Sequence, residues 1–395
     1  MPSARASSLW SPTVGVLRLA LALGLGAGAL AGSAASAPPE RLPPTNLLVF
    51  HDRHGAVRPV KSRRDWQRRR AEILRGFEQI AGALPGREKR CALDVRVEEV
   101  TDCGRYERRR ITYQSEPGCR VPAWLLIPKA ALESRKKFPA VLCLPPTDGQ
   151  FGARVSVEPL RPHYRAYAHD LAERGFVTLA PAYPLLAEYQ PDLRALGWPS
   201  GTLKAVWDNL RALDLLDAQP FVARGRYGAI GHSLGGHNAI FTALHEPRLR
   251  VLVSSCGFDS FLHYYDGKSD LWQPERGWCQ TRYMPRLADY RGRLEEIPFD
   301  FHELLGALAP RPVFVSAPLR DDNFRAASAA EVVRAAAAVY QLLGSPENLV
   351  LEQPDCGHDF PSEVRERAYR WLERHLSARD RISNQGDARA DRVIR

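Results

Sequence analysis

From residue 140 onward, short apolar runs alternate with segments of helical periodicity, and this alternation restricts the possible folds more than any other feature. The runs expected to be strands are 140–144, 177–180, 227–231, 251–255, 312–316 and 349–352. The segments expected to be helices are 164–173, 203–216, 234–244, 326–343 and 363–376. Such an alternation predicts an α/β protein, with a mostly parallel sheet covered by helices on both faces.

Three further β-like runs precede this alternating part, at 93–100, 106–113 and 121–127. Gly-containing turns separate them, so they predict antiparallel N-terminal strands. The alternation is interrupted at 259–310, a stretch rich in aromatic residues, glycine and proline. We expect this stretch to be a cap inserted over the carboxyl edge of the sheet.

The two ends of the chain of 395 residues differ in composition from the rest. Arg5 and Arg18 precede the apolar, acid-free run 19–30, and small residues follow it, so 1–37 is typical of an export signal peptide. An uncleaved anchor is the alternative. We expect a periplasmic or secreted protein that has no stable membrane insertion after signal removal, a main α/β domain over 91–378 and a polar tail at 379–395.

The arm at 38–90 carries much of the net charge of +10, concentrated at 61–75. Ser62 and Asp65 have the spacing of a helix capping box. The apolar residues that recur at helical spacing behind them are Trp66, Ile73, Phe77 and Ile80. We therefore expect a docked amphipathic helix with a solvated basic face and no nucleic-acid partner. Attraction to an acidic polysaccharide or another anionic surface is the alternative.

Seven cysteines in an exported chain permit disulfides. Cys103 and Cys119 would lie at opposite ends of one strand, too far apart to bond, so Cys91 with Cys119 is the preferred pair. Cys143 and Cys256 fall in or at the end of buried strands and are expected to be inert thiols.

The spacing of cysteine and histidine predicts no metal site. His51 and His54 form an H-x-x-H sequence without helix signals or suitable carboxylates nearby. No cofactor is expected either, because the chemistry described next needs none.

The sequence Gly-His-Ser-Leu-Gly-Gly at 231–236 follows directly on the expected strand 227–231. A strand, a tight turn and a helix at this point would present the hydroxyl of Ser233 above the sheet edge, with the N–H of Leu234 free to bind an oxyanion. Ser233 is therefore the candidate nucleophile.

A serine nucleophile needs a base and a group that orients the base. His358 follows the expected strand 349–352, and Asp321 and Asp322 follow the strand 312–316, so all lie at the carboxyl edge of the sheet. His358 is the expected base and Asp321 the expected orienting acid, with Asp322 as the alternative.

Four other residues near these positions were weighed against them. His232 and His237 flank the serine, but position argues against either as the base, and His237 is expected to be a buried histidine with satisfied hydrogen bonds. Asp355 and Asp359 are too close to His358 in sequence to reach its distal ring nitrogen easily.

The order Ser, Asp, His resembles that of the α/β-hydrolase superfamily, and within it the exported hydrolases similar to dienelactone hydrolases and acetyl xylan esterases. The resemblance covers roughly 93–376. Apart from the serine turn, the motifs that carry it lie at 171–181, 201–211, 321–324 and 357–361. It implies a serine hydrolase, although dienelactone hydrolases proper generally have cysteine at the position of Ser233.

The resemblance also implies a second oxyanion donor in the loop after strand 140–144. This chain has Pro145-Pro146 where many relatives have His-Gly or His-Gln, and proline has no N–H to donate. Thr147 is therefore the expected second donor, followed by Asp148.

The aromatic residues of the expected cap either pack its core or stack on a substrate. Those expected at a substrate site are Trp278, Tyr283 and Tyr264. The predicted function is hydrolysis of a carboxylic ester through an acyl-enzyme, on a small-molecule or polysaccharide ester. The resemblance implies a carbohydrate ester such as an acetylated polysaccharide. A uronate methyl ester would suit the basic surface, but the sequence places no arginine in the pocket.

Two alternatives stay open at this point. The first is a serine peptidase of the acylaminoacyl or dipeptidyl type, although the residues before 140 are too few for the β-propeller of those enzymes. The second is a non-catalytic binding protein with a hydrolase fold. The oligomeric state is not predicted.

Overall fold

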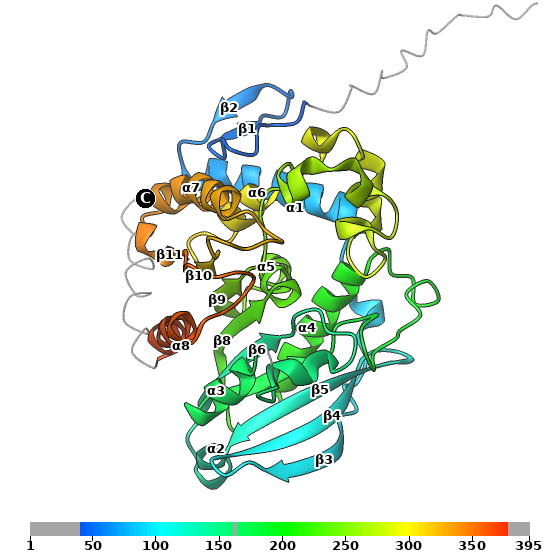
Figure 1. Cartoon of the computed structure of the whole chain (residues 1–395), viewed down its shortest axis with the longest axis vertical. Coiled ribbons are helices and arrows are strands. Elements are labelled where there is room, and N and C mark those ends of the chain that lie inside the picture. The colour runs from blue at the N-terminus through cyan, green and yellow to red at the C-terminus, as the bar shows by residue number, and fades with distance from the viewer. Residues whose placement is uncertain (1–39, 161–163, 378–395) are drawn as a thin grey trace, which may run out of the picture. The chain divides into compact units, whose positions relative to one another are not determined.

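A nine-stranded sheet with the order β11-β10-β9-β8-β6-β7-β5-β4-β3 forms the centre of the computed structural model, which describes residues 40–160 and 164–377 (Figure 1). The strands of this sheet are β3 (Arg96–Asp102), β4 (Tyr106–Glu116), β5 (Cys119–Pro128), β6 (Phe138–Leu144), β7 (Val177–Pro181), β8 (Val222–His232), β9 (Leu249–Ser255), β10 (Val313–Ser316) and β11 (Leu349–Glu352). Pairing is parallel from β7 through β6 to β11 and antiparallel among β7, β5, β4 and β3. The predicted α/β fold, with a mostly parallel sheet and antiparallel N-terminal strands, is confirmed.

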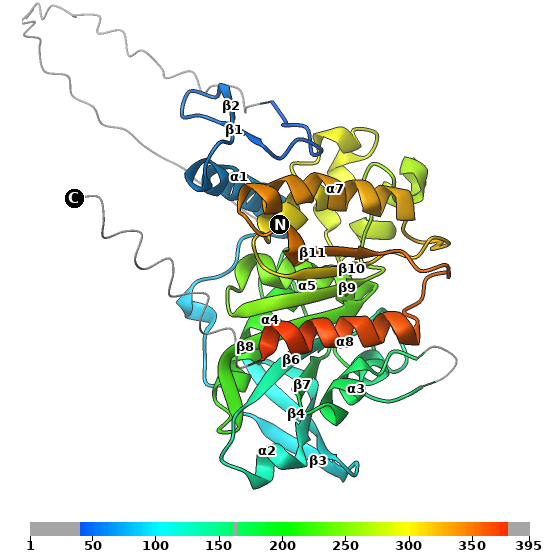
Figure 2. The same ribbon diagram turned by 90° about the vertical axis from the view of Figure 1, so that its left-hand side faces the viewer.

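Helices cover both faces of this sheet. They are α1 (Arg63–Ala81), α2 (Lys129–Glu133), α3 (Tyr167–Glu173), α4 (Gly201–Asp217), α5 (Leu234–His245), α6 (Phe301–Ala307), α7 (Ala326–Leu342) and α8 (Ser362–Leu376). Helices α3 and α8 pack on one face, and α4 and α5 on the other (Figure 2). Helix α7 contacts β11, α6 packs against α5 and α7, and α1 packs against α6. The central strands are consequently buried on both sides, as their continuous apolar sequence predicts.

The amphipathic helix of the arm forms as predicted. Ser62 caps α1 by accepting a hydrogen bond from the N–H of Asp65, and the four apolar residues expected on its inner face are buried. Arg69 is buried as well and pairs with Glu303 of α6 at 2.5 Å, which its basic sequence context did not indicate. The short hairpin of β1 (Val49–His51) and β2 (Val57–Pro59) was not predicted, because three-residue strands leave almost no periodicity.

The stretch expected to be a cap consists mainly of 3₁₀ turns between residues 264 and 296. Helix α6, which follows, begins at a capping box of Asp300 and Glu303 and packs against α5 and α7. The last part of this stretch therefore belongs to the helical layers beside the sheet. The division into an arm, a hydrolase domain and a cap stays a prediction.

The predicted Cys91–Cys119 disulfide is wrong, because all seven cysteines are free. The Sγ of Cys119 lies 3.4 Å from the hydroxyl of Tyr189, inside the protein, while the Sγ of Cys91 lies near the carbonyl of Gln114. Cys143 and Cys256 are buried, as expected.

The signal peptide at 1–37 and the tail at 379–395 lie outside the described residues. Within the described ranges, no helix combines the length and the apolar character that crossing a bilayer requires.

Candidate active site

The turn between β8 and α5 places Ser233 in a backbone conformation that is rare for a side chain other than glycine. Its φ is 54° and its ψ is −120°. The chain turns this tightly because glycines flank the serine: a Cβ on Gly231 would lie 2.2 Å from the carbonyl carbon of Gly235, and a Cβ on Gly235 would lie 2.0 Å from the oxygen of Leu144. Strain at such a position is typical of a nucleophile held above a sheet edge.

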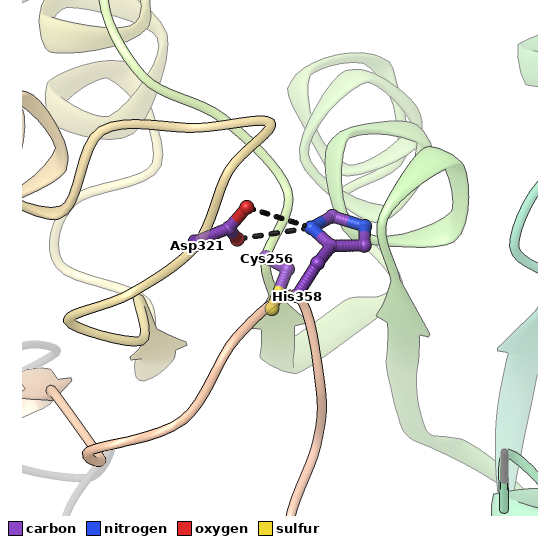
Figure 3. Close-up of side chains that lie close together, drawn as sticks. All are labelled: Cys256, Asp321 and His358. Carbon is purple, nitrogen blue, oxygen red and sulfur yellow. Dashed lines mark hydrogen bonds and ion pairs between the residues drawn. The ribbon is translucent and has the colours of Figure 1, made fainter.

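His358 and Asp321 come together across the ends of β11 and β10. The Nδ1 of His358 lies 2.9 Å from each carboxylate oxygen of Asp321 (Figure 3). Because a carboxylate only accepts hydrogen bonds, Nδ1 carries the proton in this pair when the ring is neutral, and Nε2 is the unprotonated nitrogen. Asp322, the alternative acid, lines the adjacent cavity.

The carboxylate of Asp321 is almost fully buried, with 1% of its side chain exposed. Burial alone would raise its pKa, but the hydrogen bond from His358 and those from the N–H groups of Phe324 and Asn323 outweigh burial, and its pKa lies below the usual range. Asp321 is therefore ionised at neutral pH and favours a positive charge on His358.

The loop that carries His358 is held from both sides. Arg165 donates to a carboxylate oxygen of Asp359 at 2.5 Å and to the carbonyl of His358 at 3.3 Å. On the other side, the Sγ of Cys256 lies 3.2 Å from the carbonyl oxygen of Asp359. Neither contact could be seen in the sequence, because each joins residues about 100 or more positions apart.

Cys256, Asp321 and His358 also form the cluster of possible metal-binding atoms found in the described residues, with one donor atom from each within 4.8 Å of the others (Figure 3). Burial and the neighbouring Asp321 raise the pKa of the Cys256 thiol well above its usual range. A thiol that keeps its proton is a poor metal ligand. The hydrogen bond between His358 and Asp321 already occupies the other two groups, so this donor set fits a hydrogen-bonded pair better than a metal.

The other residues weighed as acids or bases have different partners. His232 is buried at the end of β8, with its Nδ1 3.1 Å from the hydroxyl of Ser255 and its ring 4.9 Å from the ring of His358. Asp359 pairs with Arg165, and Asp355 lies 3.1 Å from Arg320. Asp355 and Asp359 are thus each paired with an arginine.

Two cavities meet at Ser233. The larger, of about 650 Å³, is lined by Pro146, Thr147, Asp148, Gln150, Phe151, Val155, Leu160, Arg165, His232, Ser233, Asp322 and His358. The smaller, of about 70 Å³, is lined by Thr147, Ser233, Leu234, His237, Tyr264, Gly277, Trp278, Tyr283, Asn323 and Phe324. Residues with polar or charged side chains are the most numerous in the lining of the larger cavity, and residues with ring-bearing side chains in that of the smaller.

All three aromatic residues predicted at a substrate site, Trp278, Tyr283 and Tyr264, line the smaller cavity. Trp278 also packs among other buried rings. It therefore belongs to the core and to the lining of the cavity, the two roles considered for the aromatic residues. Thr147 and Leu234, the predicted oxyanion donors, also line this cavity, and the hydroxyl of Thr147 lies 3.1 Å from that of Tyr283.

Sequence reasoning missed Arg165, Asn323 and Phe324 as lining residues and misjudged His237. The ring of His237 is buried as expected, but only its Nδ1 has a partner. Its Nε2 makes no hydrogen bond with any described residue. The position of His237 one helical turn after the nucleophile was the available signal, and it was interpreted as pointing into packing.

Comparison with known proteins gives one family match, to the model of fungal glucuronyl esterases, over residues 199–344. A 4-O-methyl-glucuronoyl methylesterase from Wolfiporia cocos is 26% identical over 45% of this chain and 47% of its own length. A putative hydrolase from Bacillus subtilis, YtaP, is 27% identical over 43% of this chain and 53% of its own. The chain thus spans about half the length of the curated relatives it matches.

Solved structures resemble a larger part of the chain. A glucuronoyl esterase from Solibacter usitatus has a TM-score of 0.66 at 20% identity and covers 87% of this chain and 100% of its own. An acetyl xylan esterase from Paenibacillus sp. R4 has a TM-score of 0.53 at 17% identity, over 72% and 90% of the two chains. At these identities the similarity shows the fold alone, which is that of the α/β hydrolases.

Proposed function

We propose that this protein is a serine-dependent hydrolase of carboxylic esters that acts on an ester of a sugar acid. The observation that carries the proposal is the arrangement at the sheet edge. A strained serine lines the same cavity as a histidine whose far nitrogen is held by a buried, ionised aspartate. Acyl transfer needs these groups and two oxyanion donors, without a cofactor.

In the proposed reaction, Nε2 of His358 takes the proton of Ser233 as Oγ attacks the ester carbonyl carbon. The oxyanion that forms is bound by the N–H of Leu234 and by a second donor at Thr147. The bond between the carbonyl carbon and the alcohol oxygen then breaks, and His358 gives its proton to the departing alcohol. Water, deprotonated by His358, attacks the acyl-enzyme, and the acid and free Ser233 are released.

The two cavities assign the two halves of the ester. His358 must reach the oxygen of the leaving alcohol to protonate it, and His358 lines the larger cavity only. The alcohol therefore occupies the larger cavity, and the acyl group extends into the smaller one beside Leu234. A large open space on the alcohol side suits a bulky or polymeric alcohol.

Two observations favour a sugar-acid ester over an acetyl ester. The segment 199–344, which contains Ser233, Asp321 and most of the smaller cavity, is the part that matches the fungal glucuronyl esterase model. The acyl cavity is walled by Trp278 and Tyr283, and aromatic rings are common platforms for the C–H faces of sugars.

The two alternative functions are not favoured. The described residues before β6 form a hairpin, two α-helices and three strands of the main sheet, and none of these elements belongs to a β-propeller of the peptidase type. A non-catalytic protein would have no need for a strained serine next to a bonded histidine and aspartate. Export from the cytoplasm remains part of the proposal, since the residues that would direct it lie before residue 40.

The test is hydrolysis of a benzyl ester of D-glucuronic acid and of 4-nitrophenyl acetate by the purified protein, beside Ser233→Ala. We expect cleavage of both, with higher kcat/KM for the glucuronate, and a loss of at least about 10⁴-fold in the variant. Cleavage that persists in folded Ser233→Ala would contradict the mechanism, and a preference for acetate would contradict the proposed substrate.

A further inference from the structure

A further hollow is formed by helix α1 and the β1–β2 hairpin that lies against it (Figure 2). Its volume of about 740 Å³ falls within the range of ligand sites. The hairpin contributes residues 50–54 to its lining, and the helix contributes Arg68, Ala71, Glu72 and Arg75. None of these residues lines either cavity at Ser233, so the hollow is a separate candidate site.

The arginines of α1 that face the protein are used to dock the helix. Arg69 pairs with Glu303 of α6 at 2.5 Å. Arg70 donates to the carbonyl oxygens of Ala307 at 2.9 Å and Leu244 at 3.1 Å. These bonds fix α1 against α6 and the end of α5, so the outer face of the helix is held in place.

Arg68, Ala71 and Arg75 share that outer face, because residues three, four and seven positions apart lie on one side of a helix. Arg68 and Arg75 are about 10 Å apart along the axis, with the small side chain of Ala71 between them. Arg75 makes no hydrogen bond or ion pair with residues 40–160 and 164–377. Arg68 has only a 3.5 Å contact with Asp65 and lies over the ring of Phe50. Both guanidinium groups are therefore available to a ligand.

The two carboxylates of the hollow are already balanced by arginines outside its lining. Asp52 accepts a hydrogen bond from Arg58 at 2.9 Å, and this bond, with one from the N–H of His54, lowers the pKa of Asp52 to about 2. Glu72 pairs with Arg69 at 3.1 Å. The three arginines of the lining thus give the hollow an excess of positive charge.

The mixture of groups suits a sugar acid better than other anions. Each carboxylate oxygen can accept two hydrogen bonds, so Asp52 and Glu72 can still accept from hydroxyl groups. A phosphate chain has no such donors along its backbone and would be repelled by both carboxylates. Phe50 is 4% exposed, so it offers no free face on which a base could stack.

We propose that this hollow is a non-catalytic binding site for a chain of uronic acid residues. The guanidinium groups of Arg68 and Arg75 bind two carboxylates of the chain, roughly two sugar rings apart, and the carboxylates of the hollow accept bonds from its hydroxyls. The site goes beyond the proposed ester hydrolysis and does not depend on it. It would hold an acidic polysaccharide on the protein while another part of the polymer is at Ser233.

The experiment measures binding by titration calorimetry to the full chain with Ser233→Ala, in which no ester is cleaved. The probes are a hexamer of 1,4-linked D-galacturonic acid and a neutral hexamer of 1,4-linked D-galactose, whose rings carry CH₂OH in place of the carboxylate. We expect one-to-one binding of the acid with a Kd below about 1 mM at physiological ionic strength. The neutral hexamer should bind at least about 10-fold more weakly.

Two variants locate the binding. Arg75→Gln should weaken it by about 5-fold, and Arg68→Gln with Arg75→Gln by about 20-fold or more. Ala71→Glu, which adds a negative charge between the two arginines, should weaken it as well. Because Arg75 has no partner in the described structure, its replacement should leave the melting temperature unchanged.

Arg135→Gln with Arg334→Gln is the matched control. Both residues are exposed, lie outside the hollow and have no hydrogen bond or ion pair with a described residue, so the pair removes the same charge elsewhere. We expect its Kd to equal that of the parent. Arg75→Gln with Ser233 intact should cleave the small benzyl glucuronate at the wild-type rate.

Three outcomes would overturn the inference. The first is equal binding of the acidic and neutral hexamers, or binding of neither. The second is an equal loss in the control pair, which would show a general effect of net charge. The third is tighter binding, with the same dependence on Arg68 and Arg75, of a single-stranded oligonucleotide of equal charge or of vesicles of phosphatidylcholine and phosphatidylserine. The ester hydrolysis proposed at Ser233 would stand in each case, because it is measured separately.

Discussion

The two cavities at Ser233 differ in size, in the types of residue that line them and in the segments that form them. The larger is formed by the loop after β6, by residues 160 and 165 and by the loop that carries His358, and it contains the charged groups Asp148, Arg165 and Asp322. The smaller is formed by the start of α5, the 3₁₀ segment and residues 323–324, and it is lined mainly by ring-bearing side chains.

The difference indicates that one side of the site supports chemistry and the other selects the acyl group. On the larger side, the charged residue Arg165 bonds the loop of the histidine that must move protons. On the smaller side, a neutral histidine and aromatic rings surround the space where the carbonyl substituent would lie. Substitutions on the two sides should therefore change different kinetic quantities.

The largest effect is expected from the acid behind His358. Asp321→Asn should lower kcat by about 10⁴-fold for every ester, because the amide favours the wrong tautomer of His358. Asp322→Asn should stay within about 10-fold, since Asp322 only lines the larger cavity. Initial rates on the glucuronate ester measure both, and equal losses in the two variants would show that the hydrogen bond to Asp321 has no catalytic role.

The next largest effect should come from the support of the histidine loop. Arg165→Gln removes the charged bonds to Asp359 and to the carbonyl of His358, and we expect kcat to fall by about 10-fold or more, with little change in selectivity between acyl groups. Arg165→Lys is the control, because lysine keeps the positive charge but lacks the two guanidinium nitrogens that bond Asp359 and the carbonyl of His358. A change in acyl selectivity as large as the change in kcat would break the division between the two sides.

A smaller effect is expected where the two cavities share a wall. The hydroxyls of Tyr283 and Thr147 form a hydrogen bond between the 3₁₀ segment and the loop after β6. Tyr283→Phe and Thr147→Val each remove one of the two hydroxyls and therefore this bond. We expect each to lower kcat by about 5-fold, the equivalent of about 1 kcal/mol. If the pair acts through one bond, the double variant should be no slower than either single one, and additive losses would indicate independent roles.

The smallest effect on activity should come from a buried carboxyl behind the smaller cavity. Asp259 accepts a hydrogen bond from the N–H of Arg325, next to the lining residue Phe324. Burial raises the pKa of Asp259 to about 8, and this bond lowers it only in part. Asp259→Asn should leave kcat within a few-fold and change the pH dependence of stability instead.

The sign of that dependence follows from where protons bind. Between the unfolded pKa near 4 and the folded value near 8, only the folded state keeps the proton, so the contribution of Asp259 to stability decreases as pH rises. The melting temperature of Asp259→Asn relative to the wild type should therefore increase from pH 5 to pH 8.5, by the equivalent of more than about 1 kcal/mol. A difference that does not change with pH would contradict the raised pKa.

The sequence predicted the elements that build the site more completely than the contacts within it. Each strand and helix expected from residue 140 onward is present, and Ser233 lies in the expected turn. Asp321 and Asp322 could not be separated, because neighbouring residues in a loop point in different directions that only the surrounding chain fixes. Arg165 was missed for a similar reason, since its partners Asp359 and His358 lie more than 190 positions away.

Two predictions about single side chains show where local reasoning stops. Cys91 and Cys119 were paired by strand geometry, yet each side chain contacts a different group, because the positions of strand ends do not determine which groups a side chain contacts. His237 was expected to be satisfied, as most buried histidines are. In the structure, only one of its two ring nitrogens has a hydrogen-bond partner among the described residues.

By itself, the sequence determined the order of strands and helices, the cap of α1 and the serine turn. These depend on periodicity and on backbone conformations that a few adjacent residues dictate. Only the tertiary structure decided which acid bonds His358, which arginine holds its loop and which rings surround the acyl side. Those contacts join distant segments whose relative positions are fixed by packing of the whole core, and no short stretch of sequence contains that information.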